Sequence, residues 1–148
     1  MIDTPKPFPG RLGLIQRVLP GYRAPFFDAL SAACAGGLSV FAGQPLPVES
    51  IAITDKLNAA RFAQARNVHI FNPQHPLYFC YQRGLSGWLA DWNPDALIIE
   101  ANFRYLSSPA AMRWMKKRSR PVIGWGLGAP LSRGFPKGNE KQILAPFL

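Results

Sequence analysis

The chain has 148 residues, of which 48% are hydrophobic, and its 17 Lys and Arg against 8 acidic residues give a formal net charge of +9. This length and hydrophobicity suit a single domain with a substantial core and exclude a disordered chain. The basic excess favours an anionic partner (nucleic acid, a phosphorylated small molecule or a membrane surface) over a basic surface without a specific partner.

The few cysteines and histidines indicate the compartment and argue against a metal. Cys34 and Cys80 form no Cys-x-x-Cys pair, so we expect a reducing, cytoplasmic environment and thiols that fill core space within helices. His69 and His75 stand too far from other ligands to predict a metal site, and no cofactor is expected. The start of the chain, 1–10, lacks the apolar region of a signal peptide, and no segment has the roughly 20 apolar residues that span a bilayer.

The first recognisable element is a strand, a loop and a helix over residues 11–28. The apolar run 12–15 predicts a buried strand, Pro20-Gly21 breaks the chain, and Pro25 opens an amphipathic helix. This order is typical of the start of a doubly wound α/β domain, in which the loop after the first strand borders the ligand. The side chains and glycine that we expect to bind substrate in this loop are Gln16, Arg17, Gly21, Tyr22 and Arg23.

Strands and helices then alternate along the chain. Apolar runs between turn residues predict strands at 38–42, 68–71, 96–99 and 121–125. Residues 46–66 are ambiguous, and 55–66 within them is a candidate helix. Ser108-Pro109 predicts the N-terminal cap of a helix over 110–118. A helix is also predicted from Pro76, with a close packing contact to justify Gly84 and Gly87. Its apolar stripe consists of Leu77, Cys80, Tyr81, Leu85, Trp88 and Leu89.

We therefore predict an α/β fold: a Rossmann-like, doubly wound parallel sheet in a three-layer α/β/α domain over 11–131, with strand order 3-2-1-4-5. A short arm over 1–10 precedes this domain and a tail over 132–148 follows it. The first and fourth strands then adjoin at the switch point, and Tyr22 or Arg23 should lie within reach of Asn102 or Arg104. Further substrate-binding candidates follow the fourth and fifth strands: Glu100, Asn102 and Arg104, which alternate and so should share one side of the chain, and Trp125 and Gly126.

Three common nucleotide or phosphate motifs do not fit. Residues 124–129 satisfy G-x-G-x-x-A, but they follow the fifth strand rather than the first, and Pro130 follows them directly. The chain contains no G-x-x-x-x-G-K-[ST] sequence, which removes the P-loop. A response-regulator domain needs acidic residues at the end of the first strand, and none lies between Asp3 and Asp28.

A basic cluster surrounds Trp114 and Met115 on the helix predicted at 110–118. It either lies on anionic lipid, at the inner face of the plasma membrane, or is a solvated face near a helix C-terminus. Nucleic acid is not expected as a partner, because most aromatic residues fall on buried stripes. The cluster consists of Arg113, Lys116, Lys117, Arg118 and Arg120.

Residues 11–30 resemble the opening of bacterial GT-B glycosyltransferases that build cell-surface glycans, in which "YR.PFF..L" starts the first helix. Pro94-Asp95, Asn102, Arg104 and the stretch 121–128 also resemble that family, so the resemblance covers most of 11–130. It implies two Rossmann-like domains, the amino-terminal one binding a glycan or lipid-linked acceptor and the carboxyl-terminal one binding the nucleotide-sugar. Many relatives have histidine where this chain has Leu127, which leaves a role for that histidine in doubt.

The resemblance thus predicts the acceptor-side half of a glycosyltransferase. We expect the 148-residue chain to show no turnover by itself, because the donor domain is missing. The apolar residues of 143–148 should either be disordered or drive self-association, so we expect the chain to be prone to oligomerise. The alternative is a freestanding α/β module that binds a phosphorylated small molecule. A second Rossmann domain encoded downstream would discriminate between the two.

Overall fold

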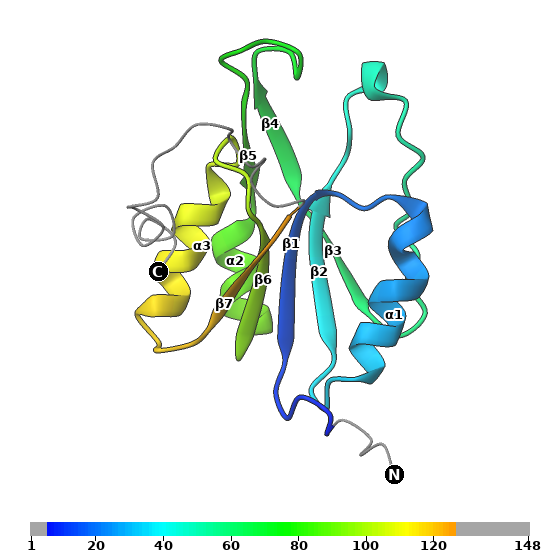
Figure 1. The fold of residues 1–148 in the computed structure, drawn as a ribbon, viewed down its shortest axis with the longest axis vertical. Helices are drawn as coiled ribbons and strands as arrows, with labels where there is room; N and C mark the ends of the chain where they lie inside the picture. Colours follow the sequence, from blue (N-terminus) through cyan, green and yellow to red (C-terminus); the bar gives the residue numbers. More distant parts are fainter. Residues whose placement is uncertain (1–5, 127–148) are drawn as a thin grey trace, which may run out of the picture.

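A computed structural model describes residues 6–126 of the protein as a parallel sheet with helices on both faces (Figure 1). The sheet has five strands in the order β3-β2-β1-β6-β7, and an antiparallel pair, β4 and β5, forms a separate hairpin. The strands are β1 (Leu12–Val18), β2 (Leu38–Gly43), β3 (Arg61–Gln64), β4 (Arg66–Ile70), β5 (Phe79–Arg83), β6 (Ala96–Glu100) and β7 (Val122–Trp125). The helices are α1 (Ala24–Ala32), α2 (Leu85–Trp92) and α3 (Ser107–Lys116), with short 3₁₀ turns η1 (Gly21–Arg23) and η2 (Pro47–Glu49).

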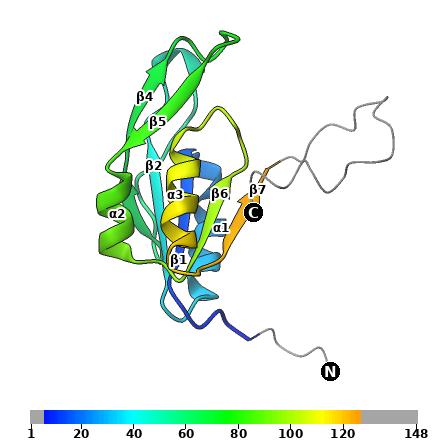
Figure 2. The same ribbon diagram turned by 90° about the vertical axis from the view of Figure 1, so that its left-hand side faces the viewer.

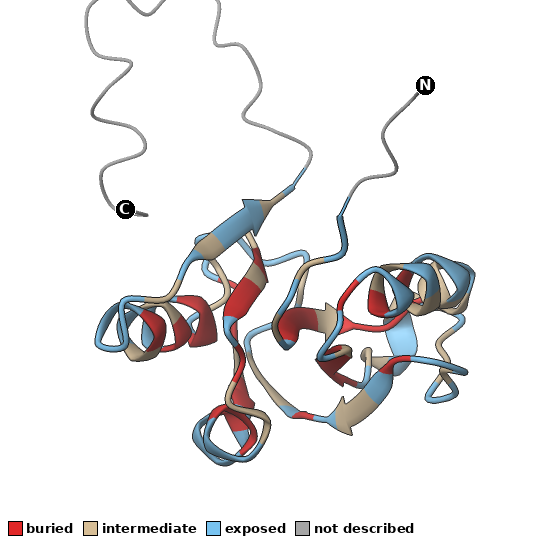
Figure 3. Cartoon of the chain, turned by 90° about the horizontal axis from the view of Figure 1, so that it is seen from below, coloured by how far each residue is buried: buried red, intermediate tan, exposed pale blue. Residues whose placement is uncertain are grey.

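Apolar side chains on both faces of β1 place this strand at the centre of the core. Leu12 and Leu14 join the cluster beneath α1, in which Phe27 is fully buried, and Ile15 joins the cluster beneath α2 and α3 with Met115. Successive strand residues point to opposite faces, so an uninterrupted apolar run requires cover on both sides. Figure 3 shows the buried positions concentrated on the strands and on the inner sides of the helices.

The predicted α/β class and parallel sheet are confirmed, and β1 lies between β2 and β6 as expected. The predicted order 3-2-1-4-5 is wrong for the strands on which it was based, because 68–71 is not part of the sheet. Residues 66–70 pair antiparallel with 79–83 instead. The edge of the sheet is occupied by β3, whose Phe62 pairs with Val40, so the candidate helix at 55–66 is also wrong.

The predicted helix from Pro76 is a strand followed by a shorter helix. Tyr78, Cys80 and Gln82 are buried in alternation, and the pairing of His69 with Cys80 fixes this stretch as β5. Helical and extended periodicities both place residues four apart, such as 77 and 81, on the same face, so the apolar spacing did not distinguish a helix from a strand. Cys80 therefore lies in a strand and Cys34 just after α1, and both thiols are buried.

A glycine in the left-handed region makes the change from β5 to α2 possible. Gly84 has φ +94° and sits at the N-terminal cap position of α2. Gly87 lies inside the helix, and a Cβ there would have no neighbour within 4 Å. The close packing contact predicted for Gly87 is therefore absent.

These two glycines should respond oppositely to the same substitution. We expect Gly84→Ala to lower the free energy of unfolding by about 1–2 kcal/mol, because alanine is strained at positive φ. Gly87→Ala should raise it by up to about 1 kcal/mol through helix propensity. Urea unfolding measures both, and a loss at Gly87 equal to that at Gly84 would contradict the assigned boundary.

The loop between β6 and α3 is hydrogen-bonded to β5, and α3 begins earlier in the chain than the sequence predicted. Cys80 N–H donates to Arg104 O (2.9 Å), and Gln82 N–H donates to Ser107 Oγ (2.7 Å). The helix begins at Ser107, so Ser108 is a buried helical residue rather than the predicted N-terminal cap. The basic C-terminal end of α3 precedes β7 and thus lies at the amino ends of the parallel strands (Figure 2).

Within residues 6–126, no helix has the length and apolar character needed to cross a bilayer. The first residues of the predicted arm and the whole predicted tail, 132–148, lie outside the described residues. In the described part of the arm, Phe8 pairs with the chain around Cys34 through a short parallel bridge and packs against the core.

Candidate functional site

Three predicted site residues lie side by side across the carboxyl end of the sheet. Ile15 pairs with Ile99 in neighbouring strands, so Gln16 is level with Glu100, and Glu100 pairs with Trp125 in β7. Gln16 follows Leu14 by two residues, Glu100 follows Ile98 by two, and Trp125 pairs with Glu100. Because strand residues alternate between faces, all three side chains lie on the face that α1 covers. Parallel strands bring these side chains from three distant parts of the sequence to one row.

The β1–α1 loop adds a cation and aromatic rings to this row. The Arg23 guanidinium carbon lies 5.3 Å from the centre of the Trp125 ring and 5.5 Å from that of Tyr22. The Trp125 ring also approaches Phe26 at 6.0 Å and stacks with Phe27 at 6.2 Å between centroids. We call Gln16, Tyr22, Arg23, Glu100 and Trp125 the switch-point cluster.

The Gln16 side chain is an unsatisfied polar group in the core. It is 1% exposed, and within the described residues neither its Nε2 nor its Oε1 has a hydrogen-bond partner. A buried amide without partners destabilises the folded state, because it has lost its hydrogen bonds to water and gained none in exchange. The hydrogen-bonding capacity of this amide is therefore unused within the described residues.

A β-bulge at Arg17 explains why Glu100 stands beside it. The ladder pairs Gln16 with Ala42 and Val18 with Gly43, so Arg17 is the extra residue and its backbone has no ladder partner. The Glu100 carboxylate accepts the Arg17 N–H at 2.8 Å. Burial raises the pKa of Glu100, against the opposing effects of this hydrogen bond and of the nearby Arg23 and Arg17 charges.

The Arg17 side chain is used to hold η2 and is not free for a ligand. Its guanidinium makes two hydrogen bonds to the Glu49 carboxylate, at 2.8 and 2.6 Å, and the two side chains are only 12% and 13% exposed. The hydrogen bond from Arg17 is the main cause that lowers the pKa of Glu49. Arg17 was predicted to bind substrate, but in the structure its side chain forms an ion pair with Glu49.

Two amides that sequence reasoning missed complete the bulge. Asn67 Nδ2 donates to Arg17 O (2.7 Å) and Gln44 O (2.9 Å), and Gln82 Nε2 donates to Gln16 O (2.9 Å). Asn67 fits because position 43 is glycine, where a Cβ would overlap its amide. The alternation of Tyr78, Cys80 and Gln82 was the available signal for an inward-pointing Gln82.

Asn102 and Arg104 do not continue the row. The strand ends at Glu100, and Asn102 Oδ1 accepts the Arg104 N–H (3.0 Å) in a turn, so strand alternation no longer applies. The Arg104 guanidinium lies over the Phe103 ring. No hydrogen bond or ion pair within residues 6–126 joins Tyr22 or Arg23 to Asn102 or Arg104, and their proximity stays a prediction.

The two predicted glycines occupy backbone positions near the cluster. Gly21 N–H donates to Ala52 O (3.0 Å), which connects η1 to the chain after η2. At Gly126, a Cβ would lie 3.7 Å from the Ala101 side chain. Both positions border the carboxyl end of the sheet.

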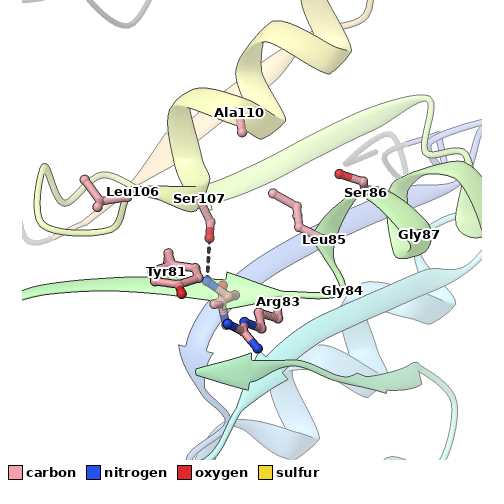
Figure 4. A pocket seen from close by; sticks show the side chains of 10 residues that line it. Tyr81, Arg83, Gly84, Leu85, Ser86, Gly87, Leu106, Ser107 and Ala110 are labelled. Atoms are coloured by element: carbon pink, nitrogen blue, oxygen red, sulfur yellow. Dashed lines mark hydrogen bonds between the residues drawn. The ribbon is translucent and has the colours of Figure 1, made fainter. Parts of the chain in front are cut away.

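A surface hollow of about 390 Å³ lies apart from these residues, between β5 and the first turns of α2 and α3 (Figure 4). None of the predicted site residues lines it. Two of its polar side chains are already engaged: Ser107 Oγ accepts the Gln82 N–H, and Gln82 Nε2 donates to Gln16 O. The other polar side chains that line it are Tyr81, Arg83 and Ser86.

The basic cluster on α3 is partly engaged in intramolecular contacts. Arg120 Nη1 donates to Asn93 Oδ1 (2.6 Å) and Pro94 O (2.9 Å), and the Arg118 guanidinium lies 3.6 Å from the Trp114 ring centre. Arg113, Lys116 and Lys117 are exposed. In residues 6–126, no three His, Cys, Asp or Glu side chains are placed to hold a metal ion.

Compared with known proteins, the chain matches no family model, no curated protein and no solved structure. The arrangement of its own residues is therefore the basis for assigning a function.

Proposed function

We propose that this chain is the amino-terminal, Rossmann-like acceptor domain of a GT-B glycosyltransferase, which transfers a sugar from a nucleotide-sugar to a cell-envelope glycan or lipid-linked acceptor. The observation that supports this most is the switch-point cluster, at the carboxyl end of the sheet where β1 and β6 adjoin. Ligands of open α/β sheets bind at this position. The resemblance of residues 11–30 to the family agrees with it.

The chemistry of the cluster suits a sugar. A carboxylate such as that of Glu100 accepts hydrogen bonds from sugar hydroxyls, and aromatic surfaces such as Trp125 and exposed Tyr22 pack against the apolar faces of the ring. The unsatisfied Gln16 amide can accept and donate further hydrogen bonds. Aromatic walls with a few polar groups are typical of small-molecule sites.

A second candidate, a binding module for a phosphorylated small molecule, is favoured by the start of α1. This helix has no capping side chain and no acidic residue in its first turn, and Arg23 stands at its N-terminal cap position. Ala24 N–H already donates to Gly21 O and Pro25 has no N–H, so the helix dipole and the adjacent guanidinium are what suit a phosphoryl group. The same cluster would then bind the ligand without transferring a sugar.

Sugar transfer and ligand binding separate the two candidates. We expect transfer from a panel of nucleotide-sugars only when the chain is joined to a donor-binding Rossmann domain, since catalysis requires both substrates to be fixed together. Arg23→Gln should weaken binding of phosphorylated sugars to the 148-residue chain by about tenfold or more, as expected for a lost charge-assisted contact.

Arg113→Gln is the matched control, because it removes the same charge from the exposed face of α3. It should leave binding unchanged. Equal losses from both substitutions would contradict the assigned site. Turnover by the 148-residue chain at the rate of the extended form would contradict the half-enzyme proposal, and binding without any transfer by the extended form would favour the second candidate.

A further inference from the structure

The exposed apolar side chains of the described residues gather at one end of the molecule. Nine large hydrophobic residues are exposed, and eight of them belong to the β4–β5 hairpin or to segments that directly follow β1, β2 or β6. The eight are Tyr22, Phe26, Val48, Ile70, Phe71, Leu77, Phe103 and Leu106; the ninth, Ile123, lies in β7. A concentration of this kind marks an interaction surface.

Two segments of the chain project furthest from this end of the sheet. The hairpin and the segment that carries η2 both extend past the carboxyl ends of β1 and β2 (Figures 1 and 2). The loop joining β4 to β5 presents Phe71 (58% exposed) and Leu77 (59%), and η2 presents Val48 (66%). We call Val48, Phe71 and Leu77 the apolar tips.

The hairpin loop is held in one conformation by its own hydrogen bonds. His75 N–H donates to Asn72 O (2.8 Å), Tyr78 N–H donates to His75 O (3.0 Å), and Leu77 N–H donates to His75 Nδ1 (3.1 Å). The Phe71 ring stacks on His75 with centroids 4.6 Å apart, and Phe71 has φ +64°. A bulky residue held at positive φ with its ring exposed indicates a loop built to present that ring.

Both projections are also fixed to the sheet. Glu49 in η2 is paired with Arg17, and Asn67 in β4 donates to the Arg17 carbonyl. Gln82 connects β5 to the Gln16 carbonyl. The apolar tips therefore need little ordering when they bind, which preserves affinity.

The charge around the hairpin suits an anionic partner. No acidic residue occurs between Asp55 and Asp91, while Arg66 and Arg83 lie at the base of the hairpin. Arg23 and Arg104 stand at the same end of the sheet, each over an exposed aromatic ring. Aromatic side chains with adjacent cations are typical of residues at a membrane–water interface.

We propose that the apolar tips insert into the interfacial region of an anionic lipid bilayer. Separate projecting tips suit a fluid lipid surface, which needs no complementary pocket for each one, better than a folded protein partner, which does. This binding is independent of the proposed sugar transfer. It also places the membrane at the opposite end of the sheet from the basic cluster of α3, so the two surfaces predict different effects of mutation.

Vesicle co-sedimentation at low salt tests the proposal with the full 148-residue chain. We expect binding to vesicles of phosphatidylglycerol mixed with phosphatidylcholine, and little binding to phosphatidylcholine alone. The double variant Phe71→Ser with Leu77→Ser should bind about tenfold or more weakly, because most of the inserted apolar area is lost. Ile123→Ser, an equally exposed apolar residue outside the tips, should bind like the wild type.

A depth probe checks the orientation. Leu77→Cys carrying an environment-sensitive NBD label should shift its emission to the blue on addition of vesicles, whereas labelled Ile123→Cys should not; Cys34 and Cys80 are buried and should resist labelling. Unchanged binding of the double variant, no shift at position 77, or loss of binding only on Lys116→Gln with Lys117→Gln would overturn the proposal. So would an effect of the tips on self-association without any binding to vesicles.

Discussion

Phe27→Ala should lower the free energy of unfolding by about 3–5 kcal/mol, a large part of the stability of a domain of this size. Phe27 is completely buried, packs in the cluster that joins α1 to β1 and β2, and stacks with Trp125 at 6.2 Å. Alanine would remove the buried ring and leave a cavity that the surrounding strands can only partly close. Chemical unfolding monitored by tryptophan fluorescence measures the change.

The neighbouring residue provides the control for this prediction. Phe26 is 52% exposed although its ring lies only 5.6 Å from that of Phe27. Phe26→Ala should cost only about 1–2 kcal/mol, because about half of this side chain stays in contact with water in the folded protein. If the two substitutions destabilised the protein equally, α1 would not be rotated as the structure has it.

Arg17→Met should destabilise the protein by about 3 kcal/mol or more, because it leaves the Glu49 carboxylate largely buried without its cation. The double variant Arg17→Met with Glu49→Leu should recover much of this loss, since no unpaired charge then remains. Thermal and urea unfolding of the four proteins of this cycle give the coupling between the two residues. Additive effects would contradict the pairing.

The same pair predicts a pH dependence with a definite sign. Arg17 lowers the pKa of Glu49 in the folded state, so the pair contributes stability above the ordinary pKa of glutamate, and this contribution is lost as the pH falls through the folded value. The stability difference between wild type and Arg17→Met should therefore shrink in acid. A constant difference from neutral pH down to below the ordinary range of a carboxyl would contradict this account.

The residues of the switch-point cluster could be named before the structure because their convergence follows from topology. Gln16 and Glu100 end two apolar runs, and parallel neighbours must present their carboxyl ends together. The part played by Arg17 could not be named, because its bulge depends on a one-residue mismatch with β2. Its partner Glu49 comes from a 3₁₀ turn with no periodicity in the sequence.

The hairpin is the clearest case in which the sequence was ambiguous. Between Leu77 and Arg83, helical spacing and two-residue alternation are both present. The strand forms because this stretch pairs with β4, whose His69 lies 11 residues before its partner Cys80. Similarly, Arg61–Gln64 is a strand because it pairs with β2 at the edge of the sheet. Tertiary hydrogen bonds overrode local propensity at both places.

The sequence by itself determined the α/β class and the strands predicted at 12–15, 38–42, 96–99 and 121–125, because short apolar runs between turn residues favour strands. The first three are largely buried, whereas the last forms the partly exposed edge strand β7. Tertiary structure alone decided what surrounds them: which residues form the edge strand, where the hairpin projects, and which polar groups satisfy the bulge at Arg17. Those choices depend on partners brought together only by folding, since a backbone N–H or a carboxylate must be satisfied wherever the fold places it.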